Sequence, residues 1–417
     1  PDLLVGWAPK QLLVVTTTRD ILSIEGARET AQEMKKVYRA FGAEQHFAKV
    51  EDDDEHTSTK ANREAMYAFF QKYLNNPGDN TDAAVDTFTH GELNVTENGQ
   101  IQTSVDGRTI FEINRADAEQ MLARRPKKID PSRIRQAAMY WNGYRPPQSA
   151  PKVVYCGAFN RDDMRLERYF MHGEGDYVLP FYVLKPQKQG PLPAVLYLHP
   201  EGKAAAARQP VVRELIANGN AVILPDLLGR GEVGPGVHRG DAYDFKQGNA
   251  NYNVWFGAIQ LGRSLVGIHA GDINRLMLYL QTRDDIQADA IRVIGEETLA
   301  PALLHAAVFS NSFSEIDLLK PLGSYESLVM NKYYIPKFML AAVPGGLKDY
   351  DLPELCAALA PTPLRIINPV SQFDEPLSEK DASDVYRKSG DYYKKNKAKF
   401  EFRTGLADEE VVELLGN

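Results

Sequence analysis

The sequence predicts an α/β protein in which helices cover both faces of a parallel-rich sheet. Short apolar segments of strand length, such as residues 194–199, 221–226 and 291–295, alternate with longer segments of helical periodicity. The alternation begins at the amino end, stops after residue 78, and starts again in complete form after residue 150. We therefore expect one partial and one complete copy of the same kind of fold.

Composition narrows the class of protein. The chain has 417 residues, 43% hydrophobic and 25% charged, enough for more than one cored domain. No apolar run approaches the roughly 20 residues that a membrane crossing needs. The net charge of −8 and the small basic clusters at 124–128 and 394–399 argue against a nucleic-acid partner. Two cysteines suit neither a disulfide framework nor a metal centre, so we expect buried thiols and no cofactor.

Residues 1–78 predict strand, helix, strand, helix. An apolar strand at 11–17 ends near Asp20, and a second short strand at 46–51 leads into an acidic loop, 51–55, that presents His56. One apolar face marks the helix after the first strand: Ala27, Ala31, Met34, Tyr38 and Phe41. A similar stripe marks the helix after His56: Met66, Phe69, Phe70 and Tyr73. Two parallel strands and two helices leave sheet edges and faces bare, so this segment does not make a domain by itself.

Residues 79–150 differ in character. Asn98-Gly99 and Asp106-Gly107 are turn signals between short β-like pieces at 91–96, 100–104 and 109–113. A polar helix is expected at about 115–125. We expect this region to be a β-rich linker that docks as a small β-structure.

Residues 151–417 predict a second, complete α/β pattern. Edge strands are expected at 153–159, 165–173 and 176–185, and core strands at 194–199, 221–226, 291–295 and 364–368. A long helix is expected across 256–281. The last pieces, 400–404 and 407–415, repeat the strand and helix that surround His56.

Several motifs, in this order and spacing, resemble the acetyl xylan esterase-like branch of the α/β-hydrolases, enzymes that cleave esters on plant polysaccharides. In the opening segment these are Thr17-Thr18-Arg19-Asp20, Ile24-Glu25-Gly26, Glu55-His56 and Arg63-Glu64-Ala65-Met66-Tyr67, followed by a tail-like stretch at 92–114. In the later segment they are His199-Pro200-Glu201-Gly202-Lys203, Asp226-Leu227-Leu228-Gly229-Arg230-Gly231-Glu232, Leu261-Gly262-Arg263-Ser264-Leu265 and Asp349-Tyr350-Asp351-Leu352-Pro353. The resemblance covers nearly the whole chain, the linker least securely.

The resemblance implies that Asp20 and His56 are the acid and base of a serine-hydrolase triad. Such folds carry the triad in the chain order Ser, Asp or Glu, His, so the serine is expected upstream of Pro1. A serine hydroxyl is a weak nucleophile, which is why an imidazole must take its proton and a carboxylate must orient that imidazole. The alternative is an exposed Asp and a His in a solvated acidic loop. A further alternative is a metal site formed by Asp52, Asp53, Asp54, Glu55 and His56, since oxygen-rich loops bind hard cations.

The second copy departs from the family at all three triad positions. Gly295-Glu296-Glu297-Thr298-Leu299 replaces GxSxG, with Glu297 at the serine position and Leu299 where a glycine would permit the sharp turn, so we expect the elbow to be lost. The acid position holds Ser371, and the histidine position holds Leu406. We therefore expect a pseudo-hydrolase. His199 follows a core strand where oxyanion-hole backbone is placed, and with no nucleophile present we favour a structural role for it.

Two functions follow from these expectations. The first is a serine esterase acting on carbohydrate esters, completed by the N-terminal half of the catalytic domain, either in the same precursor or as a separate chain. The second is a non-catalytic module that binds polysaccharide or a protein partner, or braces the catalytic domain. Glu297 is most simply a helix-start carboxylate, and Trp141 and Trp255 are expected to serve mainly in packing. The resemblance implies a secreted or periplasmic protein.

Overall fold

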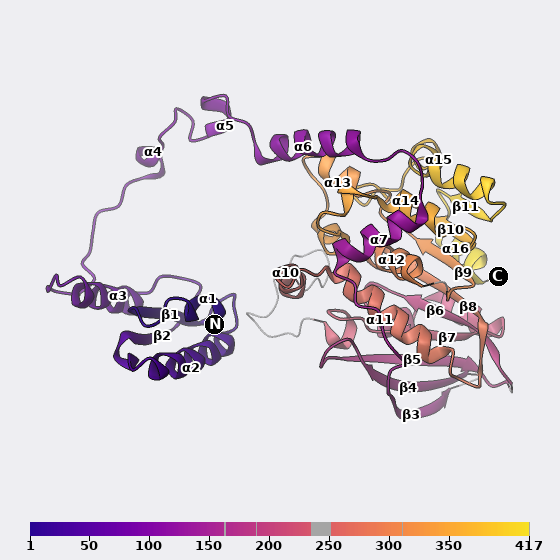
Figure 1. The fold of residues 1–417 in the computed structure, drawn as a ribbon, viewed down its shortest axis with the longest axis horizontal. Coiled ribbons are helices and arrows are strands. Elements are labelled where there is room, and N and C mark those ends of the chain that lie inside the picture. Colours follow the sequence, from indigo (N-terminus) through magenta and orange to yellow (C-terminus); the bar gives the residue numbers. More distant parts are fainter. Residues whose placement is uncertain (162–163, 189, 235–251, 311, 417) are drawn as a thin grey trace. The chain divides into compact units, whose positions relative to one another are not determined.

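The computed structural model describes residues 1–161, 164–188, 190–234, 252–310 and 312–416. The chain divides into two compact units, the first comprising residues 1–107 and the second beginning at Arg108 (Figure 1). Among the described helices, none combines the length and the apolar character that a membrane crossing needs.

The first unit contains the predicted strand–helix–strand–helix order. β1 (Leu12–Arg19) and β2 (Phe47–Glu55) form a two-stranded parallel sheet, with α2 (Ile24–Ala40) between them in sequence and α3 (Lys60–Tyr73) after them. A short α1 (Asp2–Val5) precedes β1. This parallel pair and its connecting helix form the strand–helix–strand unit typical of α/β folds, in a sheet of two strands.

The acidic residues before His56 belong to a strand and not to the expected loop, because β2 continues to Glu55. Cationic neighbours hold several of these side chains. Arg19 bonds Asp53, and both Arg28 and Lys49 bond Glu51. Since alternate residues of a strand point to opposite sides, neighbouring carboxylates are also kept apart. Charge compensation therefore lets an acidic sequence continue the strand.

Four helices, and no strand, lie between residues 79 and 150, so the expected β-rich linker is wrong. They are α4 (His90–Leu93), α5 (Ile101–Ser104), α6 (Ile110–Arg124) and α7 (Pro131–Asn142). Two begin with capping boxes, in which Thr89 pairs with Glu92 and Thr109 with Glu112, and these satisfy backbone N–H groups at each helix start. The last two helices belong to the second unit, which therefore begins at Arg108 and not at residue 151.

The second unit is built on a nine-stranded sheet in the order β11-β10-β9-β8-β6-β7-β5-β4-β3 (Figure 1). The strands are β3 (Val153–Arg161), β4 (Met164–His172), β5 (Val178–Pro186), β6 (Leu192–Leu198), β7 (Ala221–Pro225), β8 (Ile286–Glu296), β9 (Glu315–Leu319), β10 (Leu364–Ile367) and β11 (Phe400–Arg403). The first three run antiparallel at one edge, and the other six are mutually parallel. The expected strands are confirmed, and β9 is an additional one.

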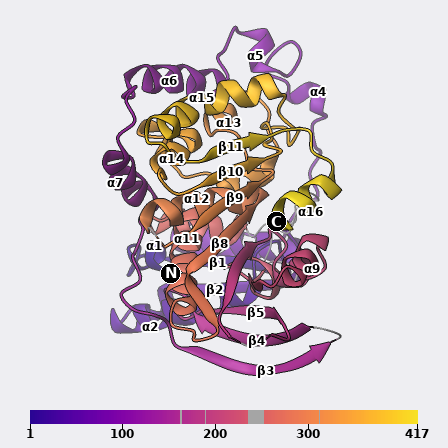
Figure 2. The ribbon, with the colours of Figure 1, turned by 90° about the vertical axis from the view of Figure 1, so that its right-hand side faces the viewer.

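Helices cover both faces of this sheet, as Figure 2 shows. The larger core lies under α7, α11 (Leu265–Leu280), α12 (Ala300–Phe309), α14 (Leu352–Ala358) and α15 (Glu379–Lys395). The smaller core lies under α8 (Lys203–Ala206), α9 (Pro210–Ala217) and α16 (Asp408–Gly416) on the opposite face. Two further helices are α10 (Tyr252–Gln260) and α13 (Glu326–Met330). Burial on both faces explains why the central strands read as continuous apolar runs.

The single long helix expected at 256–281 is two helices. Gly262 has φ +67°, a left-handed conformation that ends α10. Ser264 then caps α11 by accepting a 2.8 Å hydrogen bond from the N–H of Gly267, and its hydroxyl also donates to Asn142 Oδ1 at 2.5 Å. The cysteine expectation holds for Cys356, which is buried, but Cys156 is exposed.

The first unit and the last elements of the second share local details. α2 and α15 are both 17 residues long, and each follows a serine, Ser23 and Ser378 respectively. Each carries a buried tyrosine whose hydroxyl donates to a backbone carbonyl just before the preceding strand. Tyr38 donates to Lys10 at 2.7 Å, and Tyr393 donates to Thr362 at 2.9 Å. In both units, a tyrosine thus anchors the helix to the start of the strand that precedes it: α2 to β1 and α15 to β10.

Candidate functional site

Asp20 and His56 meet at the carboxyl ends of β1 and β2. Asp20 directly follows Arg19 and His56 directly follows Glu55, and those two strand ends are paired neighbours in the parallel sheet. The imidazole Nδ1 lies 3.0 Å from each carboxylate oxygen of Asp20. Residues 36 positions apart are thereby brought into contact by strand pairing alone.

The environment of Asp20 favours its ionised form. Partial burial opposes ionisation, but hydrogen bonds from His56, from the Leu22 N–H at 3.1 Å and from the Thr17 hydroxyl at 3.2 Å lower the pKa of Asp20 below its usual value. A carboxylate that accepts from Nδ1 fixes the neutral imidazole in the tautomer whose Nε2 lacks a proton. The pair can therefore orient a general base.

His56 is the more accessible member of the pair. Its side chain is 65% exposed, compared with 22% for Asp20. Within the described part of the chain, Nδ1 is the only atom of this imidazole that makes a hydrogen bond. Its Nε2 thus has no hydroxyl partner among these residues. The alternative was a metal site. Among the described residues, no group of three or more His, Cys, Asp or Glu side chains is arranged to hold a metal ion.

The nucleophile elbow of the second unit keeps its backbone, contrary to expectation. β8 ends at Glu296, Glu297 takes φ +47°, and a short 3-10 turn leads into α12. Positive φ on a residue with a side chain costs about 1–3 kcal/mol, and the surrounding packing must hold it. A Cβ on Gly295 would lie 2.8 Å from Leu303 of α12, which explains the glycine before the turn. The turn survives because packing enforces it, although its serine is replaced.

An ion-pair cluster surrounds Glu297, the residue that the sequence comparison set at the serine position. Lys337 Nζ lies 3.0 Å from the Glu297 carboxylate and 2.6 Å from that of Asp374. Burial alone would lower the pKa of Lys337, but hydrogen bonds to Asp374 and Glu297 raise it overall. Nearby, the half-buried Arg230 donates to the Thr298 hydroxyl at 3.1 Å. Glu297 is thus neutralised by a cation.

Ser371 and Leu406, which were expected at the acid and histidine positions, make turn and backbone contacts. The Ser371 hydroxyl accepts a hydrogen bond from the Phe373 N–H at 3.1 Å, as a turn residue does. The backbone of Leu406 exchanges two hydrogen bonds with the side chain of Asn368, at 2.8 and 3.0 Å. These loops follow β10 and β11, as those of Asp20 and His56 follow β1 and β2. An amide-to-backbone bridge therefore stands where the first unit has a carboxylate and an imidazole.

His199 belongs to a buried polar cluster. Its Nδ1 accepts from the Glu201 N–H at 3.1 Å, which places the proton of a neutral ring on Nε2. That nitrogen lies 3.8 Å from the Glu296 carboxylate, which also accepts the Tyr197 hydroxyl. Burial raises the pKa of Glu296 above its usual range. The contacts are those of a structural residue.

The two motifs that follow β6 and β7 hold each other by a buried ion pair. Lys203 and Asp226 are 2% and 1% exposed, and Nζ lies 2.5 Å from the carboxylate. Gly202 and Gly231 have positive φ, and a Cβ on either would approach Asp226 within 2.3 Å. Glu232 gives Lys203 a second, more exposed carboxylate at 2.7 Å. These residues pin two loops at the carboxyl edge of the sheet.

Sequence reasoning missed the residues that pair with the degenerate positions. Lys337 lies in a 3-10 segment (Pro336–Ala341), and Asp374 lies in a turn, where neither belongs to a recognisable motif. Arg230 could have been noticed, because it stands between Gly229 and Gly231 in a motif that was identified. Trp141 packs as expected: its Nε1 donates to Asp349 at 2.8 Å. Trp255 lies in a small apolar cluster.

Comparisons with known proteins place the fold. No protein-family model matches the chain, and no curated protein matches it by sequence. The solved structure of a "putative acetyl xylan esterase" from Bacteroides fragilis is similar, with a TM-score of 0.58 and 18% identity over 72% of this chain and 84% of that one. An acetyl xylan esterase from Paenibacillus sp. R4 (TM-score 0.46, 13% identity, 71% and 97% covered) and a glucuronoyl esterase from Solibacter usitatus (0.45, 14%, 79% and 98%) are less similar. At such identities the likeness concerns the fold.

Proposed function

Starting from an α/β-hydrolase fold of the acetyl xylan esterase-like kind, we propose that this chain is part of a serine esterase acting on carbohydrate esters. Asp20 and His56 are its acid and base, and the serine belongs to polypeptide outside residues 1–417. The observation that carries this proposal is the 3.0 Å contact between His56 Nδ1 and Asp20 at two adjacent strand ends. This is the arrangement that base and orienting carboxylate need.

The partial nature of the first unit supports a missing companion. Among the described residues β1 and β2 form a sheet of two strands, each with one unpaired edge. In the second unit β10, which holds the place of β1, pairs with β11 on one side and with the parallel β9 on the other. We propose that β1 likewise pairs with a parallel strand from the segment that carries the serine, in the same precursor or in a separate chain.

The proposed reaction uses the pair in the usual order of acyl transfer. His56 Nε2 takes the serine proton as the hydroxyl attacks the ester carbonyl, and then gives that proton to the leaving alcohol. Water attacks the acyl-enzyme with His56 again acting as base, which releases the acid. Asp20 stays ionised throughout and stabilises the imidazolium, consistent with its lowered pKa.

Labelling with a fluorophosphonate probe tests where the serine lies. The protein is isolated from its natural source, labelled, and resolved by gel and intact-mass analysis. We expect the probe on a GxSxG serine outside residues 1–417 that travels with this chain, because a fluorophosphonate reacts with a serine activated by its histidine. Peptide mapping of the label to a serine within residues 1–417 would reject the proposal.

We further propose that the second unit is a pseudo-hydrolase that braces the catalytic part or binds a partner. Its whole core is retained while Glu297, Ser371 and Leu406 replace the triad. Glu297→Ser should therefore create no ester turnover above that of the unaltered chain, since no histidine stands at the positions of Ser371 and Leu406, and the neighbouring Lys337, paired with Asp374, stays an ammonium ion that cannot take the proton of the new hydroxyl. Hydrolysis of p-nitrophenyl acetate measures this. A clear gain of turnover in this single variant would show that the site remains active.

A further inference from the structure

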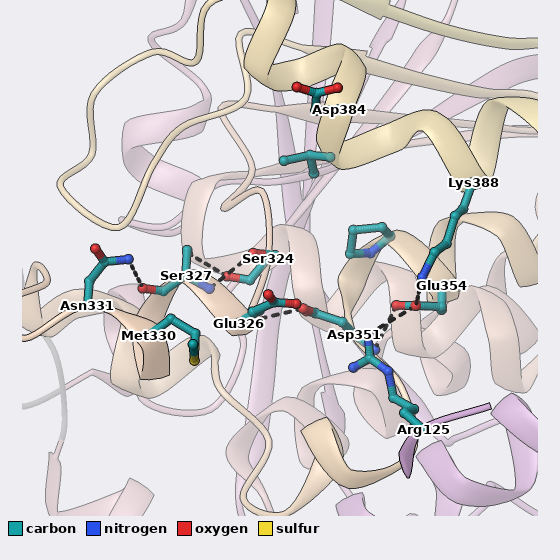
Figure 3. Close-up of a pocket in the computed structure, with 12 residues that line it drawn as sticks. Arg125, Ser324, Glu326, Ser327, Met330, Asn331, Asp351, Glu354, Asp384 and Lys388 are labelled. Atoms are coloured by element: carbon teal, nitrogen blue, oxygen red, sulfur yellow. Dashed lines mark hydrogen bonds and ion pairs between the residues drawn. The ribbon is translucent and has the colours of Figure 1, made fainter. Parts of the chain in front are cut away.

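The second unit contains two adjoining hollows whose lining residues do not include Glu297, Ser371 or Leu406. Their volumes are about 450 and 280 Å³, and they share Arg125, Glu326 and Lys388. The end of α6, α13, the first turn of α14 and the middle of α15 form them, and Figure 3 shows the larger hollow. We call the pair the Arg125–Lys388 groove. Together they reach the size of small-molecule sites, about 300–1,000 Å³.

The smaller hollow, at one end of the groove, is lined by more cations than carboxylates, the carboxylate being that of Glu326. Asp384 lines the larger hollow and pairs with Arg387. Arg125 and Lys388 both contact the same oxygen, Oε1 of Glu354, at 3.1 and 3.3 Å. The other oxygen of Glu354 accepts the Asp351 N–H at 3.2 Å, so both oxygens of this buried carboxylate already have partners. Lys127 adds a third cation to the smaller hollow. An anionic group placed here gains charge-assisted hydrogen bonds from these cations.

Asp351 does not neutralise these cations. Its carboxylate accepts three backbone N–H groups, from Tyr325, Glu326 and Leu352, at 2.6 to 3.0 Å. Burial is the main cause that raises its pKa to about 6. It is therefore a structural cap at the base of the groove. Lys388 remains 58% exposed and has two further N–H donors to offer.

The other end of the groove is lined by groups that suit hydroxyls. Ser324, Ser327 and Asn331 form one wall in Figure 3. The Asn331 Nδ2 donates to the Ser327 carbonyl at 2.8 Å, which leaves its Oδ1 as an acceptor. Glu326, which lines both hollows, is exposed, and its carboxylate makes no ion pair among the described residues. Carboxylate and amide oxygens here can accept from the O–H groups of a ligand.

From these two ends we propose that the Arg125–Lys388 groove binds a small hydroxyl-bearing organic acid, with its carboxylate at Arg125, Lys127 and Lys388 and its hydroxyls toward Asn331 and Glu326. The groove shares no residue with the Asp20–His56 pair or with Glu297, Lys337 and Asp374. The proposed binding therefore goes beyond the proposed function.

Titration calorimetry on the full chain with D-gluconate and D-sorbitol tests the proposal. The two compounds differ at one end, where gluconate has a carboxylate and sorbitol has an alcohol. Gluconate should bind at least tenfold more tightly than sorbitol, and acetate and inorganic phosphate should bind more weakly than gluconate. Lys388→Ala should weaken gluconate about tenfold, because it removes a charged donor. Lys380→Ala, on an exposed position of the same helix α15, is the matched control and should change nothing.

A second variant separates the two ends of the groove. Asn331→Ala should weaken gluconate but leave acetate unchanged, since acetate has no hydroxyl for that wall. Far-ultraviolet circular dichroism and thermal melts confirm that each variant is folded. Equal binding of gluconate and sorbitol, equal effects of the two lysine variants, absence of gluconate binding at millimolar concentration, or phosphate binding as tight as gluconate would each overturn the proposal.

Discussion

Replacing His56 with alanine in the complete protein should lower ester turnover by about 10⁴- to 10⁶-fold, because triad members act as a unit and losing one removes most of the benefit of all. Asp20→Asn should cost about 10⁴-fold, since an amide donates where the carboxylate accepts and so favours the wrong imidazole tautomer. The measurement is kcat on an acetylated sugar ester, using protein that carries the serine-bearing segment.

Two controls sharpen this experiment. His90→Ala removes an exposed histidine from the same unit and should leave kcat unchanged. A fluorophosphonate probe should label the serine of the His56→Ala protein far more slowly, which shows that the loss lies in activation of the nucleophile. Near-normal turnover in the His56 variant would remove the basis for the proposed catalytic pair.

The second large effect concerns stability. Asp226→Asn should reduce the free energy of unfolding by about 3 kcal/mol, because it leaves the ammonium of Lys203 buried without its nearest counter-charge. Glu232 remains at 2.7 Å, but its side chain is 64% exposed, so we expect the lower end of the usual 3–5 kcal/mol range. Urea denaturation followed by tryptophan fluorescence measures the change.

A matched control for this variant is Asp284→Asn, at an exposed position of the same unit. It should change stability by no more than about 0.5 kcal/mol. Lys203→Met in the Asp226→Asn background should recover part of the lost stability, since a neutral side chain no longer needs a partner. Equal unfolding midpoints for Asp226→Asn and its control would show that the pair contributes little.

Residues 79–150 show where local signals compete. Asn98-Gly99 and Asp106-Gly107 are genuine turn signals, and they favoured a β interpretation of the residues around them. The threonine–glutamate capping boxes at 89–92 and 109–112 were equally visible, and they decided the outcome. A β-hairpin also needs a partner strand and a buried face, whereas a capped helix satisfies its backbone alone. An exposed segment with both kinds of signal therefore forms helices.

The elbow at Glu297 shows a different limit. Replacement of the serine and of the final glycine indicated that the turn itself would be lost. The structure retains it, because Gly295 still allows α12 to approach β8 and the buried Leu299 fills space in the core. Backbone shape is enforced by packing over many residues, while chemistry depends on single side chains. The shape of the turn can therefore persist without the side chain that catalysis would need.

The sequence by itself determined the α/β class, the strand–helix–strand–helix order of residues 1–78, every strand of the nine-stranded sheet except β9, and the candidates Asp20 and His56. These follow from periodicity and from the rule that parallel strands bring their carboxyl ends together. Only the tertiary structure decided the side-chain contacts: that His56 meets Asp20, that Lys337 neutralises Glu297, and that Arg125 and Lys388 share Glu354. Periodicity is a local property of the chain, whereas charge pairing depends on which distant residues packing brings within a few ångströms.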